Sequence, residues 1–219
     1  TYKLPDSANK VIYEFTHLPL GGKEVICPYF INPKSQRASL RVLVGKGDPG
    51  EIAREVKVLA QLKGLDLYKM TEQEIRQFMS NNHIGIDCSG LVVHVYNYWL
   101  KLQGNKPLIK YIKFNSTNWY TLLKRILRPV EQIGANLLTN TDNTKQINDL
   151  NKVRPGDLLR SKGHVKNSHH VSIISEVTMI NDKVTEIEYV HSISGYEDEQ
   201  GIRYGKLLMN DPKKPLEQQ

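Results

Sequence analysis

The sequence has few of the features that mark whole classes of protein, beginning with cysteine. Only Cys27 and Cys88 occur among 219 residues, so at most one disulfide can form and a disulfide framework is excluded. No spacing of Cys and His is typical of a structural zinc site. No hydrophobic run approaches the length of a membrane span, and residues 1–5 are not typical of a signal peptide. We therefore expect no transmembrane segment.

Clusters of one charge are also absent, although the chain is basic. The net charge of +7 and the isoelectric point near 9.2 favour anionic surroundings such as wall polymers or membrane surfaces. Lys and Arg are not interleaved with aromatic residues, so we expect no specific nucleic-acid partner. The stretch 45–50 lacks the Gly-Lys-Ser/Thr ending of a phosphate loop. We interpret it as a turn in which Asp48 caps a helix with Pro49 at its first position.

The most informative stretch that is present is Ile86-Asp87-Cys88-Ser89-Gly90, which leads directly into an apolar segment, 91–100. A helix that is apolar on nearly all sides is normally buried in the middle of a domain. Cys88 would lie in its first turn, where unpaired N–H groups and the helix dipole stabilise a thiolate. The sequence thus predicts a catalytic cysteine. The alternative is an inert buried cysteine that packs as a small hydrophobic residue.

Two later segments favour the catalytic interpretation. Residues 153–160 are typical of a turn that leads into a strand, and 168–175 of a strand with alternating faces, with His170 and Ser172 on one of them. A histidine that starts a strand and faces a cysteine at a helix N-terminus is what a thiolate–imidazolium pair requires. His169 would point the opposite way on a strand, and the Val-Ser-Ile-Ile continuation favours His170.

These motifs together resemble the NlpC/P60 superfamily of papain-like cysteine hydrolases, to which the CHAP amidases are related. The resemblance covers about residues 70–205 and depends on Asp-Cys-Ser-Gly, Pro-Gly-Asp and His-Val-Ser-Ile-Ile in this order. It implies that Cys88 is the nucleophile, that His170 is the general base and acid, and that His191 orients the imidazole. It requires neither a metal nor an organic cofactor.

The sequence departs from the family in three respects. One is the separation of 191 − 170 = 21 residues between His170 and His191, which fits two strands joined by a longer turn. The family usually carries a Tyr with a glycine-containing run about a dozen residues before the nucleophile, and here residues 76–82 replace it. Asn82, six residues before Cys88, is our candidate for the oxyanion donor that papain-like enzymes place there. The interval between Cys88 and His170 is also long. We attribute it to an insertion at about 130–152, which either shapes substrate access or is a plain surface loop.

The expected fold class is α+β, with a papain-like core in which an antiparallel sheet packs against the helix that carries Cys88. We divide the chain into an N-terminal extension (1–47), a catalytic domain (48–210) and a polar tail (211–219). The extension is expected to hold a small hairpin, and residues 162–168 a polar loop able to cover the cleft. The expected strands are 24–31, 38–44, 108–114, 157–160, 170–177, 184–192 and 201–207, and the expected helices are 48–63, 71–81, 88–103 and 116–127.

The expected activity is hydrolysis of an amide bond through a thioester on Cys88. The family resemblance implies the peptide stems of bacterial cell wall as substrate, cleaved between D-glutamyl and meso-diaminopimelate residues, and a location outside the cell or in its envelope. Two alternatives stay open. One is a CHAP-like amidase or acyltransferase with the same catalytic residues, and the other is a non-catalytic interaction domain that keeps the fold.

Overall fold

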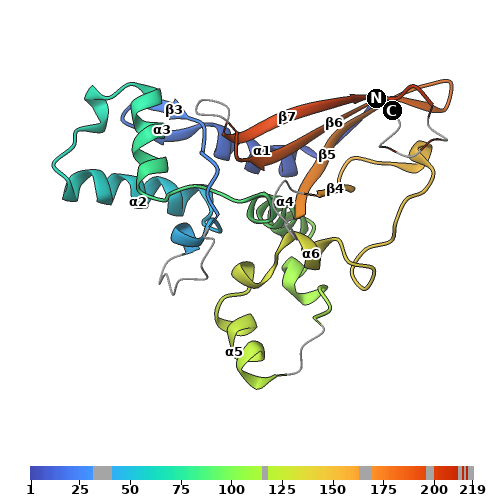
Figure 1. The fold of residues 1–219 in the computed structure, drawn as a ribbon, viewed down its shortest axis with the longest axis horizontal. Helices are drawn as coiled ribbons and strands as arrows, with labels where there is room; N and C mark the ends of the chain where they lie inside the picture. Colours follow the sequence, from blue (N-terminus) through green and yellow to red (C-terminus); the bar gives the residue numbers. More distant parts are fainter. Residues whose placement is uncertain are drawn as a thin grey trace.

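A five-stranded antiparallel sheet forms one side of the molecule, and most of the helices lie below and beside it (Figure 1). The computed structural model describes residues 1–31, 41–114, 118–162, 169–195, 200–211, 214 and 216. Three strands follow each other in order across the sheet, and two shorter strands both pair with the first of these. The strands are β5 (His169–Ile180), β6 (Lys183–Ile193), β7 (Gly201–Leu208), β4 (Leu158–Lys162) and β1 (Tyr2–Lys3). The structure thus confirms the α+β class and the antiparallel sheet.

The long hairpin of β5 and β6 is the centre of this sheet. Ile180 pairs with Lys183 across a two-residue turn, in which Asn181 and Asp182 have positive φ angles of 49° and 61°. Asn and Asp tolerate this conformation, which a tight hairpin turn requires. Both faces of the hairpin are covered, since the adjacent residues Ile173 and Ile174 belong to two different apolar clusters.

Helix α4 (Cys88–Leu102) packs against β5 and β6, and its first two turns lie in the core. Four apolar residues of these turns are fully buried, which agrees with the apolar character of the segment: Leu91, Val92, Val93 and Val95. The helix ends where expected, because Gly104 adopts a φ angle of +73°. Because its buried residues lie in the first turns, the N-terminal part of α4 is the part that packs against the sheet.

Helix α1 (Asp6–Thr16) packs on α4 and was not expected from the sequence. The expected helices include none in the N-terminal extension, yet Ala8, Val11, Ile12 and Phe15 are buried at helical spacing. The expected hairpin of 24–31 with 38–44 is wrong. The observed hairpin joins β2 (Leu18–Leu20) to β3 (Lys23–Val25), and Arg41–Val44 forms a 3-10 turn, η1. Residues 32–40 lie outside the described residues.

Two helices before α4 begin with the caps that the sequence predicts. Helix α2 (Pro49–Leu62) starts with a capping box between Asp48 and Glu51, and α3 (Glu72–Asn81) with one between Thr71 and Glu74. A 3-10 turn, η2 (Leu67–Lys69), joins them. In Figure 1 both helices lie on the left, beyond the end of the sheet that is farther from the two chain termini.

The segment between α4 and β4 is more irregular than expected. Residues 108–114 form no strand, and only a 3-10 turn, η3 (Leu108–Lys110), is regular there. Helix α5 (Trp119–Leu127) confirms the expected helix, while residues 116 and 117 lie outside the described part. The predicted insertion holds η4 (Val130–Gln132), α6 (Ala135–Leu138) and η5 (Leu150–Lys152), and it buries Val130, Ile133, Leu138 and Leu150. It is therefore packed against the core and is not a plain surface loop.

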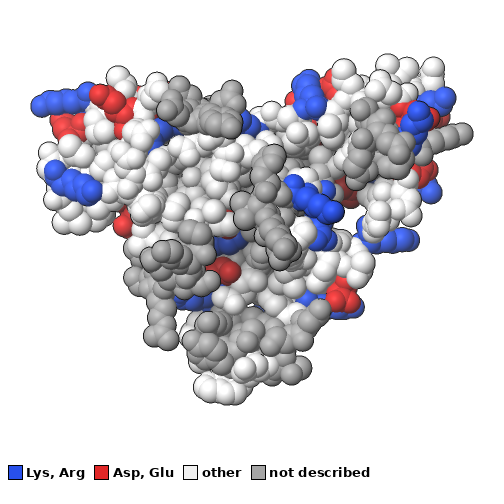
Figure 2. Space-filling view, in the orientation of Figure 1, with Lys and Arg blue, Asp and Glu red and all other residues white. Residues whose placement is uncertain are grey.

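No helix within the described ranges is long and apolar enough to cross a membrane. Figure 2 shows Lys and Arg in several separate places on one face of the molecule, interspersed with Asp and Glu.

Candidate active site

Cys88 is the first residue of α4, directly after the N-cap Asp87. Asp87 accepts a hydrogen bond from the backbone N–H of Gly90 at 2.6 Å, so its carboxylate closes the first turn around the cysteine. Gly90 allows close packing, because a Cβ atom there would lie 2.6 Å from the carbonyl oxygen of Gly45. Cys88 is only 7 % exposed. The Asp-Cys-Ser-Gly sequence thus provides a cap, places the Cys88 thiol in the first turn of the helix, and leaves room for a neighbouring backbone.

The backbone N–H groups of Val171 and Ser89 approach the sulfur of Cys88 and favour its ionised form. Burial and then the charge of Asp87 raise the pKa of the Cys88 thiol, while these N–H groups and Lys46 act in the opposite direction. The sequence predicts a stabilised thiolate, whereas the raised pKa favours a neutral thiol at rest. Because the Val171 nitrogen is bonded to the carbonyl carbon of His170, the backbone of His170 lies immediately beside the sulfur.

His170 and His191 come from neighbouring strands and are in contact. Nε2 of His170 lies 2.9 Å from Nδ1 of His191, and the two rings meet edge to face. The register explains this contact, because Ile173 pairs with Val190 and both histidines then lie on the other face of the hairpin. Burial lowers the pKa of His170, and burial together with the positive charges of His170 and Arg203 lowers that of His191 to about 4. Both imidazoles are therefore neutral near pH 7.

The adjacent His169 has different neighbours. Its ring lies 3.2 Å from the guanidinium of Arg160. Both residues line a hollow of about 470 Å³ together with α6, through Asn136, Leu137 and Asn140. The predicted insertion therefore borders a hollow that is also lined by His169, the residue before His170. A second hollow, of about 770 Å³, is lined by other elements, chiefly the β2–β3 hairpin, α2 and η2.

Asp157 holds the turn before β4, as expected. Its carboxylate accepts the backbone N–H of Arg154 at 2.7 Å, and the hydroxyl of Tyr96 on α4 donates to the carbonyl of Gly156. Gly156 has a φ angle of +96°, and a Cβ atom there would lie 2.8 Å from the Trp99 ring. The Pro-Gly-Asp motif thus fixes the strand that flanks β5 against the nucleophile helix.

Asn82 lies at the C-cap of α3, where both ends of its amide are engaged. Its Nδ2 donates to the Phe78 carbonyl at 2.7 Å, and its Oδ1 accepts from Lys63 at 2.6 Å. These contacts account for Asn82 as a helix cap and give no support to a role as oxyanion donor.

Tyr29 is a residue near the nucleophile that sequence analysis did not single out. It forms a parallel bridge with Ile86, two residues before Cys88. Burial, followed by the charges of Cys88 and Asp87, raises the pKa of its phenol, so the hydroxyl stays protonated and is a potential donor. No local spacing could have indicated it, because Tyr29 reaches the site from the N-terminal segment.

Cys27 is a free cysteine in the core. Over the residues that the structure describes, no group of three or more His, Cys, Asp or Glu residues is arranged to hold a metal ion. The expected loop 162–168 lies outside the described residues except for Lys162. Comparison with protein-family models, with curated proteins and with solved structures finds no match to this chain. The functional interpretation therefore depends on the geometry of Cys88, His170 and His191.

Proposed function

We propose that the chain is a cysteine hydrolase with a papain-like core of the NlpC/P60 type. One observation supports this above the others. The N–H of Val171 at the start of β5 approaches the sulfur of Cys88, and the preceding residue, His170, is bonded through Nε2 to His191. Nucleophile, base and orienting group thus come from a helix N-terminus and two adjacent strands, which is the order of roles that thiol hydrolysis requires.

Proton transfer follows from the histidine pair. His191 occupies Nε2 of His170 and leaves Nδ1 to take a proton. Because the resting thiol and imidazole are both neutral, the proton leaves Cys88 as its sulfur attacks the substrate carbonyl carbon. The imidazolium formed donates its Nε2–H to His191, whose pKa of about 4 keeps it neutral and able to accept.

The carbonyl oxygen becomes negatively charged in this step and needs donors. We assign this role to the backbone N–H of Cys88 and the hydroxyl of Tyr29. The carbon–nitrogen bond then breaks, His170 gives its proton to the leaving amine, and a thioester remains on Cys88. Water, deprotonated by His170, attacks the thioester; the carbon–sulfur bond breaks, the acid leaves and the thiol regains its proton.

The proposed substrates are the peptide stems of bacterial cell wall, cleaved between D-glutamyl and meso-diaminopimelate residues, in the envelope or outside the cell. This choice depends on the family resemblance. The basic groups of Arg160 and His169 in the hollow beside His170 support it, because a stem peptide carries several carboxylates.

The test is incubation of the full chain with a purified stem tetrapeptide, with mass spectrometry of the products. We expect a new diaminopimelate amine that is absent with Cys88→Ala. Added amine acceptors that are incorporated into the product would identify an acyltransferase, and cleavage at another amide would identify a CHAP-like amidase. No cleavage, together with no preference of thiol reagents for Cys88 over Cys27, would indicate a non-catalytic domain and overturn the proposal.

A further inference from the structure

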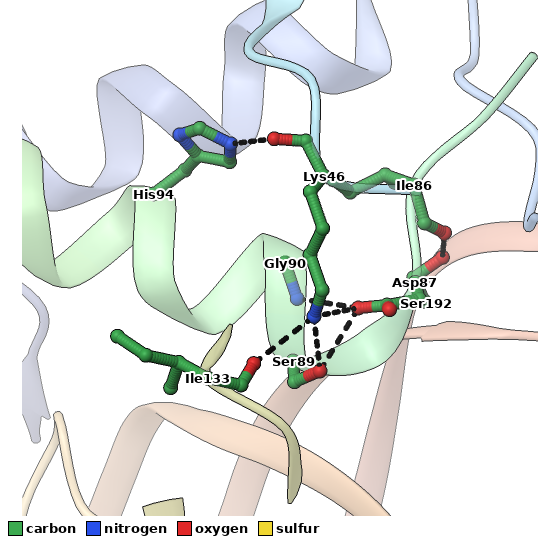
Figure 3. A network of polar contacts seen from close by, with 8 residues as sticks. All are labelled: Lys46, Ile86, Asp87, Ser89, Gly90, His94, Ile133 and Ser192. Carbon is green, nitrogen blue, oxygen red and sulfur yellow. Dashed lines mark hydrogen bonds and ion pairs between the residues drawn. The ribbon is translucent and has the colours of Figure 1, made fainter. Parts of the chain in front are cut away.

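Lys46 is a buried lysine that reaches the turn in which the nucleophile lies (Figure 3). Its side chain is 7 % exposed. The ammonium donates to Oδ1 of Asp87 at 2.8 Å, to Oγ of Ser89 at 2.5 Å and to the carbonyl of Ile133 at 3.1 Å. All three donors of the ammonium thus have acceptors, as a charge inside a protein requires.

The backbone fixes Lys46 as firmly as its side chain does. Lys46 forms an antiparallel bridge with Ile86, and Nε2 of His94 on α4 donates to the Lys46 carbonyl at 2.9 Å (Figure 3). The preceding residue, Gly45, has a φ angle of +74°, and its carbonyl accepts the N–H of Asp87 at 3.0 Å. The Gly-Lys-Gly sequence is thus explained by close packing beside the nucleophile segment.

The partner of Lys46 is electrostatically unfavourable for a nucleophilic thiol. Asp87 caps α4, accepts from the hydroxyl of Ser89 at 3.0 Å, and has a side chain that is 7 % exposed. A carboxylate next to a thiol opposes loss of the thiol proton. The cap that shapes the turn therefore works against the chemistry of Cys88 unless its charge is compensated.

The titratable and charged groups around Cys88 come from four parts of the fold. They are Asp87 at the N-cap of α4, Lys46 in the segment before α2, Tyr29 in the N-terminal segment, and the proposed base His170, which directly precedes Val171 on the sheet, with its partner His191. Among these groups Lys46 alone has a positive charge that does not depend on the state of the histidines.

We propose that Lys46 is a positioning residue that neutralises Asp87, so that this carboxylate holds the nucleophile turn without opposing the ionisation of Cys88. This role rests on Cys88 being the nucleophile, as proposed above. It assigns a function to the 45–50 stretch that differs from phosphate binding, and it joins residues before α2 to the chemistry at α4.

The test is the rate of iodoacetamide labelling of Cys88 against pH, mapped by mass spectrometry, in the full chain. In Lys46→Met the uncompensated Asp87 should raise the apparent pKa of Cys88 by about one pH unit and slow labelling about tenfold below that pKa. In Asp87→Asn the remaining Lys46 should lower the apparent pKa and speed labelling. The double variant should return to within about threefold of the wild type, since both charges are gone.

The opposite signs separate this role from a structural one, because mere damage to the turn would slow labelling in both single variants. Cys27 is the internal monitor of folding, since it becomes reactive only if the core opens. Equal profiles for Lys46→Met and the wild type, or a slower Asp87→Asn with Cys27 still protected, would overturn the proposal. A wild-type Cys88 that labels no faster than Cys27 would instead contradict the proposed function itself. If labelling of Cys27 shows that Lys46→Met has opened the core, the proposal is judged on Asp87→Asn alone. A lowered apparent pKa of Cys88 in that variant supports it, and a raised one overturns it.

Discussion

The two cysteines of this chain lie in one apolar core and share more of their electrostatics than their expected roles suggest. Burial raises the pKa of both thiols. At least one backbone N–H group and one nearby cation favour the ionised form of each thiol, and the cation is Arg76 for Cys27 and Lys46 for Cys88. Neither a cation nor a backbone donor therefore distinguishes a reactive cysteine from an inert one here.

What distinguishes them is their exposure and the base that we propose for Cys88. Cys27 is fully buried and its thiol donates to the Pro28 carbonyl at 3.6 Å, whereas Cys88 is 7 % exposed and lies beside the strand start that carries His170. The comparison teaches that a buried thiol with a raised pKa needs a base to remove its proton during attack. The predictions below test each part of this difference.

The largest expected effect is loss of turnover when the accessible thiol is removed. Cys88→Ala should lower hydrolysis of the stem peptide by at least about 1,000-fold, because no other group replaces the nucleophile. Cys27→Ala is the matched control and should keep turnover near that of the wild type. Equal losses in the two variants, measured as initial rates, would break the comparison between the two thiols.

The next effect concerns the base. His170→Ala should slow hydrolysis by about 10²- to 10⁴-fold, as expected for loss of a general base. His169→Ala, one residue away, should keep most of the activity, because the His169 ring contacts Arg160 and not His191. Initial rates at saturating substrate give the measurement, and the prediction fails if His169→Ala is the slower variant.

The predictable part of this molecule is the part with local signals. The capping boxes at Asp48 and Thr71, the cap at Asp87 with the helix start at Cys88, and the alternation of β5 all depend on residues close in sequence. The register of β5 and β6 also explains why His170, and not the adjacent His169, contacts His191, because neighbouring residues of a strand face opposite ways. The preference for His170 as the base of Cys88 stays a prediction.

The missed parts depend on distant contacts or on ambiguous patterns. Tyr29 and Lys46 reach the site through bridges to Ile86, which no spacing in the sequence encodes. The apolar run 108–114 satisfies a strand pattern, yet it packs as an irregular segment on the core. Short apolar runs do not separate these outcomes. Asn82 followed from spacing alone, and its cap contacts show why spacing was insufficient.

A smaller effect is expected for the group that orients the base. His191→Ala leaves Nε2 of His170 without its 2.9 Å partner, so the imidazole can rotate and stabilises its cation less well. We expect a 10- to 100-fold loss of kcat with little change in KM. A loss seen only in KM would mean that His191 binds substrate and does not orient His170.

The pH dependence should show the neutral state of His170. Burial lowers the pKa of this histidine, so it remains deprotonated, and able to act as a base, below the ordinary histidine pKa near 6.5. On the acid side kcat/KM should therefore fall with an apparent pKa below 6.5. A midpoint above 6.5 would indicate a resting thiolate–imidazolium pair and would restore the expectation drawn from the sequence.

The smallest effect concerns the inert thiol and is one of stability. Cys27→Ala removes a fully buried sulfur from the core, so we expect a loss of about 1 kcal/mol in the free energy of unfolding. Cys88→Ala should lose less, because Cys88 is 7 % exposed whereas Cys27 is fully buried. Denaturant unfolding of both variants at pH 7 measures this difference. If Cys88→Ala proves the less stable variant, the thiol of Cys88 contributes mainly to core packing. That result would support the interpretation of Cys88 as an inert buried cysteine.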